Sequence, residues 1–341
     1  MKHVFMGTPK VSIIVPVYNA GSYFSKLLDS LTGQTLKEIE IILVLDCPTD
    51  GSDRVAEEYA ARDGRIVLVR NRENLHVGFS RNEGLKIARG EYIGFCDHDD
   101  WVEPEMFEKM YHQGKETGAE VVVADYWIQR GNEKWTRSIP HELPDTEFIH
   151  RQFSELVNYR PAQHNQSLFN NNGYIWNGLF QRDFLNRYHI IFPDNRVTTF
   201  EDRVFLLQVY AHAKQVGHVP QALYTHIWHG SNTGASYSFK SLAHITVYLK
   251  WLYQFLKSEG RLNTETGNYT DAVTLLTYTS FRHELRHLPV GKAVKQLKLI
   301  RQDVTLQAAI RKAFGRLWHY PPTKVVFLFL VFNPFCKRVR L

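Results

Sequence analysis

The sequence predicts an α/β fold in which helices cover both faces of a mostly parallel sheet. Two observations support this fold class. From Val11 to Tyr126, short β-branched runs alternate with amphipathic stretches of helical length. The runs are almost continuously apolar, which is typical of strands that are buried on both faces of a sheet. With 341 residues, 44% of them hydrophobic, the chain can build one large domain, or one domain and a smaller one.

The apolar runs set the expected strands, and the stretches between them set the expected helices. The strands are predicted at 11–18, 39–46, 65–70, 91–97 and 120–127. The helices are predicted at 22–32, 53–62, 79–89 and 104–117. Asp53 is the expected N-cap of the second helix, and Gly90 and Gly118 are expected to stop the third and fourth.

Three of the expected strands end in polar residues, at 16–19, 46–51 and 97–100. In sheets of this kind, ligands bind beyond the carboxyl ends of the strands, where several loops converge. We therefore expect the three strand ends to face one crevice.

The third strand end groups Asp97, Asp99 and Asp100 around His98. Clustered carboxylates repel one another unless a cation compensates, and oxygen ligands suit Mg²⁺ or Mn²⁺ rather than zinc. Because such ions commonly bridge a carboxylate to substrate phosphates, the expected ligand is a diphosphate. The alternative is an acidic helix N-terminus before Pro104, where carboxylates interact well with the helix dipole.

The last third of the chain differs from the rest in charge. Residues 1–229 hold 24 Lys/Arg and 30 Asp/Glu, whereas residues 230–341 hold 17 and 5. Amphipathic helices are expected at 241–258, 268–285 and 293–302. The basic charge fits either solvated helix faces or a surface for an anionic partner.

The three cysteines, Cys47, Cys96 and Cys336, are too few and too scattered for a disulfide framework or a zinc site. No stretch has the length of a signal peptide or of a membrane span. We therefore expect a cytoplasmic protein that is neither secreted nor membrane-spanning.

Three motifs together resemble the family 2 glycosyltransferases, inverting enzymes with the GT-A fold. They are VSIIVPVYNAGSYFSKLLDSLTGQ, IEIILVLDCPTDGS and NLHVGFSRNEGLKIARGEYIGFCDHDDWVEPEMF, within residues 10–115. Weaker similarity continues to about residue 235 through WNGLF, FEDRVF and YTHIWHGSN. The resemblance implies a GT-A domain over 1–235, with a nucleotide-binding half at 10–127, an acceptor-binding half at 128–235, and a helical region at 236–341. Within 128–230 we expect irregular chain with a few short helices.

The resemblance also implies roles for donor-side residues. Pro16 and Tyr18 would line the nucleotide pocket, and Asp46 would accept a hydrogen bond from the base, usually uracil. Arg81 would lie near the nucleotide. Asp97 would bind the ribose and Asp99 the metal ion, Mn²⁺ or Mg²⁺. Many members carry Asp-Asp-Gly-Ser-Thr-Asp where this chain has LDCPTD at 45–50, so the base would be held somewhat differently.

Sugar transfer also needs a general base near the acceptor hydroxyl. Glu201 and Asp202 begin an apolar-periodic helix, where first-turn acids are ordinarily explained by the helix dipole. The resemblance instead makes Asp202 the base and Glu201 either a residue that supports the base or an acceptor contact. One base without an enzyme nucleophile would invert the anomeric centre.

Three further residues have both a functional and a structural explanation. The resemblance puts His229 near the leaving phosphates, although an ordinary hydrogen-bonded loop histidine fits equally well. Trp176 and Asn177 would line the acceptor side, where an aromatic ring can stack on a sugar. Core packing is the commoner use of a single tryptophan.

The apolar run at 325–332 precedes a basic end and is too short to span a bilayer. It fits a buried element, a dimer contact, or an interfacial anchor on anionic lipid, and we favour the anchor. We therefore expect a peripheral protein on the inner face of the cell membrane and no nucleic-acid partner. A lipid-linked glycan acceptor, as in lipopolysaccharide, capsule or O-antigen synthesis, follows from this anchor.

These observations together predict a metal-dependent inverting hexosyltransferase that moves sugar from a nucleotide-diphosphate donor, a UDP-sugar, to a glycan acceptor. Two alternatives remain. A nucleotidyltransferase acting on sugar phosphates usually has a Gly-rich loop after its first strand, where this chain has PVYNAG. A non-catalytic module that only binds nucleotide sugars would have no need of a base such as Asp202.

Overall fold

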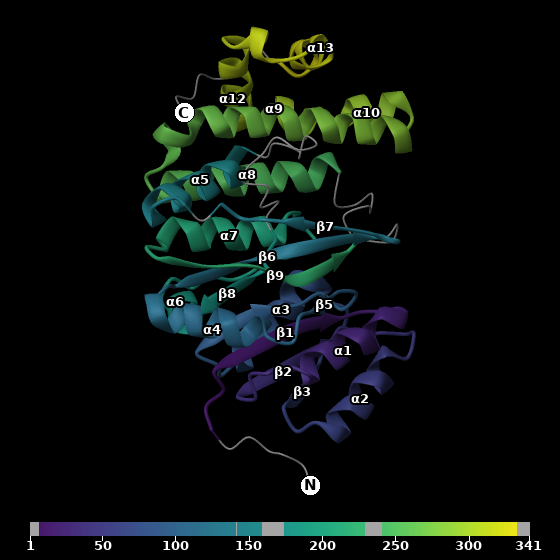
Figure 1. The fold of residues 1–341 in the computed structure, drawn as a ribbon. Helices are drawn as coiled ribbons and strands as arrows, with labels where there is room; N and C mark the ends of the chain where they lie inside the picture. Colours follow the sequence, from purple (N-terminus) through teal and green to yellow (C-terminus); the bar gives the residue numbers. More distant parts are fainter. Residues whose placement is uncertain (1–6, 141, 159–173, 229–240, 333–341) are drawn as a thin grey trace. The chain divides into compact units, whose positions relative to one another are not determined.

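The computed structural model describes residues 7–140, 142–158, 174–228 and 241–332 (Figure 1). The chain divides into two compact units. The first contains residues 1–150, 168–195 and 201–230, and the second contains 151–167, 196–200 and 231–341. The sequence-based boundary at 235 lies close to this division, but two short segments from the expected acceptor half belong to the second unit.

The first unit is built on one nine-stranded sheet with the order β3-β2-β1-β4-β8-β6-β9-β5, and β7 pairs with β6. The first four strands are parallel, and they are β1 (Val11–Val17), β2 (Ile39–Leu45), β3 (Ile66–Arg70) and β4 (Tyr92–Phe95). The helices between them are α1 (Phe24–Thr32), α2 (Ser52–Arg62) and α3 (His76–Ile87). All of these elements were predicted from the alternation of apolar and amphipathic stretches.

The rest of the first unit is more regular than predicted. It contains β5 (Trp101–Val102), α4 (Met106–Thr117), β6 (Val121–Arg130), β7 (Glu133–Arg137), β8 (Gly178–Gln181), α6 (Arg182–Arg187), α7 (Glu201–His212) and β9 (Val216–Ile227). Helix α5 (Asp145–Asn158) is divided between the units, with residues 145–150 in the first and 151–158 in the second. β8 runs antiparallel between β4 and β6, and β9 runs parallel to β6 with irregular register near Asp125. The expectation of irregular chain at 128–230 is therefore wrong, because β7, β8 and β9 join the sheet, whereas the short helices expected there are present, for example as α6 and α7.

Two helix boundaries correct the sequence-based assignment. Asp53 does not cap α2, because Gly51 precedes the helix in the left-handed region with a φ of 90°. The Asp50 carboxylate instead accepts hydrogen bonds from the Ser52 N–H and hydroxyl at 3.0 and 2.6 Å. Gly118 ends α4 with a φ of 69°, as expected, whereas α3 already ends three residues before Gly90.

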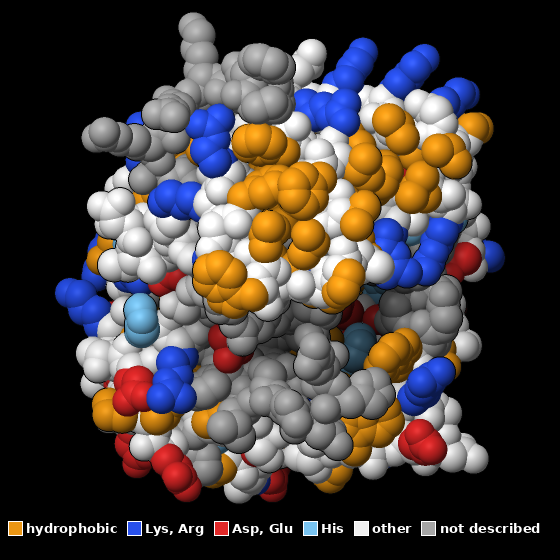
Figure 2. All heavy atoms as spheres, turned by 90° about the horizontal axis from the view of Figure 1, so that it is seen from above, with side chains coloured by type: hydrophobic (Ala, Val, Ile, Leu, Met, Phe, Trp, Pro, Cys, Tyr) orange, Lys and Arg blue, Asp and Glu red, His pale blue; other side chains and the backbone are white. Residues whose placement is uncertain are grey.

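The second unit is helical in its described part. Its helices are α8 (Leu242–Ser258), α9 (Leu262–His287), α10 (Val290–Gln296), α11 (Lys298–Arg301), α12 (Val304–Phe314) and α13 (Pro322–Val331). Ser241 caps α8 and Asp303 caps α12 by accepting hydrogen bonds from backbone N–H groups. Among the helices described, none is long and apolar enough to cross a membrane. On the face drawn in Figure 2, hydrophobic side chains gather beside lysines and arginines.

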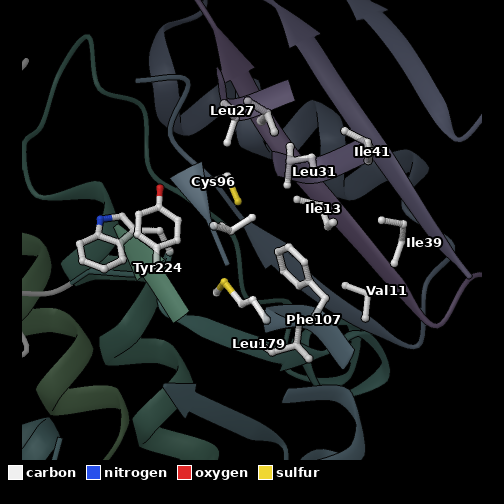
Figure 3. Close-up of a cluster of buried hydrophobic side chains, with 14 of the residues drawn as sticks. Val11, Ile13, Leu27, Leu31, Ile39, Ile41, Cys96, Phe107, Leu179 and Tyr224 are labelled. Carbon is white, nitrogen blue, oxygen red and sulfur yellow. The ribbon is translucent and has the colours of Figure 1, made fainter. Parts of the chain in front are cut away.

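The core of the first unit lies between the sheet and its helices (Figure 3). Alternate residues of β1 and β2 pack with α1 and α4, and the labelled members are Val11, Ile13, Leu27, Leu31, Ile39, Ile41, Cys96, Phe107, Leu179 and Tyr224. A Cβ atom at Gly94 of β4 would lie 2.8 Å from the Phe107 ring, so only glycine fits there. This packing fixes where β1, β2 and β4 end, and therefore where their polar ends lie.

Candidate active site

The loops after β1 and β2 are tied together by side chains. Asn19, which has a φ of 49°, accepts a hydrogen bond from the Thr49 N–H at 2.7 Å. Asp50 accepts a hydrogen bond from the Gly21 N–H at 3.0 Å, and the Ser52 hydroxyl accepts one from the Ala20 N–H. Residues that occupy the left-handed region without being glycine carry strain, which often accompanies functional sites. The two strand ends therefore form one braced wall, as the parallel sheet predicts.

Asp46 is buried at the end of β2 and uses one oxygen for internal contacts. Its Oδ1 accepts hydrogen bonds from the Asn71 side chain and from the Leu75 N–H, both at 2.7 Å. Within the described ranges, no group donates a hydrogen bond to Oδ2. Oδ2 thus keeps acceptor capacity that the described residues do not use, in a residue that is only 2% exposed. Nearby, Tyr18 is 46% exposed, while Pro16 is buried within β1.

The loop after β4 is anchored through Asp100. Its carboxylate accepts hydrogen bonds from the Tyr224 hydroxyl at 2.8 Å and from the Ile227 N–H at 2.7 Å, and His226 Nδ1 lies 3.1 Å away. Tyr224 also accepts a hydrogen bond from the Asp97 N–H. The alternative of an acidic helix N-terminus before Pro104 does not hold for Asp100, because β5 intervenes and Asp100 instead ties the loop to β9.

The environment of Asp100 changes its proton affinity. Burial raises the pKa of Asp100 to about 6, although His226 opposes this shift and the neighbouring carboxylates add to it. Burial alone would lower the pKa of His226, but the hydrogen bond and charge of Asp100 raise it overall. The hydrogen bond between the two groups therefore favours the charged form of each, against the effect of burial.

Arg81 of α3 is the centre of the site. Its guanidinium is buried and lies 2.8 Å from Asp97 and 2.5 Å from Asp202, with Glu201 at 3.8 Å. Burial alone would lower the pKa of Arg81, but the three carboxylates raise it, so the guanidinium stays charged. The structure thus joins a residue after β4 to the first turn of α7, 105 positions later in the chain.

Asp202 is largely buried beside one positive and two negative side chains. Burial raises its pKa well above the usual range; Arg81 opposes this, while Glu201 and Asp97 add to it. A carboxyl group with a raised pKa is a better proton acceptor once it is ionised, which suits a general base.

Asn195 links the first turn of α7 to the first turn of α3. Its amide donates a hydrogen bond to Glu201 at 2.8 Å, and its carbonyl oxygen accepts one from the Gly78 N–H at 2.7 Å. A Cβ atom at Gly78 would lie 2.7 Å from the Pro193 carbonyl oxygen, so α3 can approach this closely only with glycine. Residue patterns did not single out Asn195, because its partners are Gly78, 117 residues away, and a first-turn acid.

The acceptor-side expectation for Trp176 and Asn177 needs correction. Trp176 is 1% exposed, and the Tyr174, Tyr224 and His226 rings stack on it at 4.7, 4.4 and 5.3 Å. Asn177 is also buried, and its amide donates a hydrogen bond to the Ala124 carbonyl of β6. Both side chains are used in packing and hydrogen bonding within the sheet, and neither exposes a surface on which a sugar could stack. His229 lies outside the described residues.

The residues beyond β4 fit a hard divalent ion. Asp97 and Asp99 supply oxygen ligands, and both are only partly buried. Across the described parts of the chain, no three His, Cys, Asp or Glu side chains are grouped closely enough to hold a metal alone. Mg²⁺ is commonly bound by one or two carboxylates together with substrate phosphates, so this donor set is the kind that a metal–diphosphate ligand would complete. His98 is turned toward β1, with Nδ1 3.2 Å from the Pro16 carbonyl oxygen.

The chain is similar to known sugar-transfer proteins. The model of the family described as Glycosyl transferase family 2 matches residues 12–186. The putative glycosyltransferase EpsH of Bacillus subtilis (strain 168) is 34% identical over 241 residues, which cover 69% of this chain and 65% of EpsH. The poly(ribitol-phosphate) beta-glucosyltransferase of Bacillus spizizenii is 30% identical over 215 residues, covering 61% of this chain and 30% of that protein. The matches thus span less than two thirds of these relatives' own lengths.

The fold is similar to that of a solved structure, S. aureus TarS 1–349 in complex with UDP-GlcNAc. The TM-score is 0.61 at 19% identity, and the alignment covers 94% of this chain and 89% of that one. The predicted fold class, a GT-A-like α/β domain with a helical C-terminal region, is confirmed.

Proposed function

Because the chain belongs to glycosyl transferase family 2, we propose that it transfers a hexose from a UDP-sugar to a hydroxyl group of a glycan acceptor, with inversion at the anomeric carbon. The observation that carries this proposal is the junction at Arg81, which brings Asp97 from the donor side within reach of Asp202 at the start of α7. Donor-binding and proton-accepting groups are then separated by a single guanidinium.

The donor side supports a nucleotide diphosphate. Asp46, whose Oδ1 is held by Asn71 and Leu75, would accept a hydrogen bond from the N–H of a uracil base through Oδ2. Asp97, held by Arg81, would accept one from a ribose hydroxyl. TarS, which has a similar fold, was solved in complex with UDP-GlcNAc. A divalent ion, Mn²⁺ or Mg²⁺, held by Asp99 would supply charge neutralisation for the departing diphosphate.

The acceptor side supports inversion in one step. Asp202 would take the proton of the acceptor hydroxyl as its oxygen attacks the anomeric carbon, while the bond to the diphosphate breaks on the opposite side. Glu201 would contact the acceptor, because its carboxylate is held by Asn195 beside Asp202. Holding the two substrates in line lowers the barrier further.

The acceptor that we propose is a lipid-linked glycan or related polymer, as in capsule, lipopolysaccharide or O-antigen synthesis. One relative is named a poly(ribitol-phosphate) beta-glucosyltransferase, so its named acceptor is also a polymer. A lipid-linked acceptor would place the chain at the inner face of the cell membrane.

A donor screen tests the proposal. Thermal unfolding would be measured with UDP-, GDP- and dTDP-sugars, with and without Mn²⁺, and UDP release would then be followed with candidate acceptors. We expect stabilisation by one or more UDP-sugars that requires Mn²⁺ and is lost in Asp99→Ala. Stabilisation by free nucleotides and sugar phosphates, with pyrophosphate release, would instead identify a nucleotidyltransferase. Donor binding with no transfer to any acceptor would favour a binding module.

A further inference from the structure

The outer side of α13 is an apolar stripe, defined here as Val326, Phe329 and Leu330. These residues are 61%, 62% and 47% exposed, and their spacing places them on one side of the helix. The opposite side is buried within the second unit, with Phe327 2% exposed and 5.5 Å from the Phe281 ring of α9. α13 is thus apolar on both sides, although only one of them is covered by the rest of its unit.

The stripe is more than a single loose helix end. The Leu330 carbonyl accepts hydrogen bonds from the Arg301 guanidinium of α11, and the Phe329 ring contacts Phe314 of α12 at 5.0 Å. Trp318, in the turn before α13, is 79% exposed. The stripe is therefore held in place by neighbouring helices. Exposing its large apolar side chains to water is unfavourable, so a patch of this kind usually marks an interaction surface.

The stretch of chain that leads up to the stripe is strongly basic. Residues 286–332 contain nine Lys/Arg and one acid, Asp303, which pairs with Lys250. Several of these cations have no acidic partner among the described residues, namely Lys292, Lys295, Lys298, Lys312 and Lys324. Figure 2 shows hydrophobic side chains with Lys and Arg side chains beside them on one face. Apolar side chains bordered by unpaired cations are typical of a helix that lies in the interface of an anionic bilayer.

We propose that the apolar stripe of α13 binds the surface of an anionic lipid bilayer, with its side chains among the upper acyl chains and the neighbouring lysines on lipid phosphates. At ten residues, α13 is too short to span the bilayer and would lie along it. Tryptophans such as Trp318 are enriched at the level of the lipid headgroups, because the ring is largely apolar while its N–H can still hydrogen-bond to water.

A second copy of the chain is a poorer occupant of this face. Two copies that met symmetrically through these basic segments would set like charges against one another, and Asp303, the one acid of residues 286–332, is already paired with Lys250. An anionic lipid surface has the opposite charge and no fixed shape, so it can satisfy both the stripe and its cations. The inference rests on the proposed function only in that a lipid-linked acceptor would bring the chain to a membrane.

The test uses the full chain and flotation with two kinds of vesicle, phosphatidylcholine alone and phosphatidylcholine with phosphatidylglycerol. We expect binding to the anionic vesicles that weakens at high salt. Phe329→Ser and Val326→Ser should each lower the vesicle partition coefficient about tenfold, because a large apolar group no longer leaves water. Lys324→Gln and Lys298→Gln should each lower it about fivefold, and only with anionic vesicles.

Matched controls come from exposed residues of the first unit. Ile191→Ser removes a 57% exposed apolar side chain, and Arg62→Gln removes an exposed cation; both should leave the partition coefficient unchanged. Val326→Ser leaves the Phe329–Phe314 contact intact, so it still tests the stripe if Phe329→Ser disturbs the fold.

Three outcomes would overturn the inference. They are failure to float with either vesicle, flotation that is insensitive to both serine substitutions, and a dimer in sedimentation that Phe329→Ser dissociates. UDP release with a water-soluble acceptor, measured on the same samples, reports on the proposed function separately, since vesicle binding is not needed for that reaction.

Discussion

The two units place their charges in opposite ways. In the first, Arg81 is 2% exposed and shares its guanidinium among three carboxylates, while Asp100 is fully buried against Tyr224 and His226. In the second, lysines such as Lys312 project into solvent without acidic partners among the described residues. Buried, paired charge fixes the position and the pKa of a group, whereas exposed, unpaired charge attracts a partner over a distance. The first arrangement suits chemistry at one atom, and the second suits a broad surface.

The largest effect should come from the carboxylate assigned as base. Asp202→Asn should lower the rate of transfer by about 10²–10⁴-fold, because the amide cannot take the acceptor proton, while donor binding persists. UDP release and thermal shift with the donor measure the two quantities. Asp183→Asn, at an exposed first-turn acid of α6, is the matched control and should transfer normally. Full activity in Asp202→Asn would remove the assignment of the base.

Removing a buried cation should cost far more stability than removing an exposed one. Arg81→Met should lower the free energy of unfolding by about 3–5 kcal/mol, because three carboxylates lose their common partner. Lys312→Met in the second unit should change it by no more than about 0.5 kcal/mol. Denaturant titration measures both. Equal losses of free energy of unfolding in the two variants would show that the buried, paired charge stabilises the fold no more than the exposed one.

The two units also differ in how closely their glycines are packed, and we expect a smaller effect from this difference. Gly78→Ala should lower the free energy of unfolding by about 1–3 kcal/mol, because the new methyl group would meet Pro193 and Asn195. Gly291 of α10 has no atom within 4 Å of a Cβ position, so Gly291→Ala should stabilise by up to about 1 kcal/mol. A neutral Gly78→Ala would mean that α3 can move away from Asn195 at no cost.

The smallest expected effect is a shift in pH dependence. The pKa of Asp202 is raised in part by the charge of Glu201, so the rate should fall on acidification at a higher pH than for an ordinary aspartate. Glu201→Gln removes that like charge, lowers the pKa of Asp202, and should move the acid limb of the rate profile to lower pH. Glu133→Gln on exposed β7 should leave the profile in place. A shift toward higher pH would contradict the charge relation.

The part of the fold that could be predicted is the part whose strands are apolar throughout. β1 and β2 are buried along their whole length, so their sequences leave little choice of structure. β9 was missed because it is half-buried, contains Pro220, and mixes polar with aromatic residues. β8 was missed because four residues are too few to show a period, and because its pairing with β4 and β6 is decided by tertiary packing.

Within the site, the resemblance to a family located residues that local patterns could not connect. Nothing in the sequence around Arg81 indicates that it contacts Asp202, 121 positions away. The loss of Trp176 and Asn177 from the site has a similar cause, because exposure depends on the strands that cover them. Asp99 and the donor contacts of Asp46 stay predictions until a ligand is bound.

The hydrogen bond from Gly78 to Asn195 has a consequence for how the chain is made. It joins residues that leave the ribosome 117 positions apart, and it braces Glu201, next to Asp202. A nascent chain that ends before α7 would already contain the strands that carry Asp46 and Asp97, but Arg81 would still lack two of its carboxylate partners. Contacts of such long sequence separation form late, because the loop between them must first be closed. The capacity to transfer sugar would therefore be acquired after the donor-binding strands have formed.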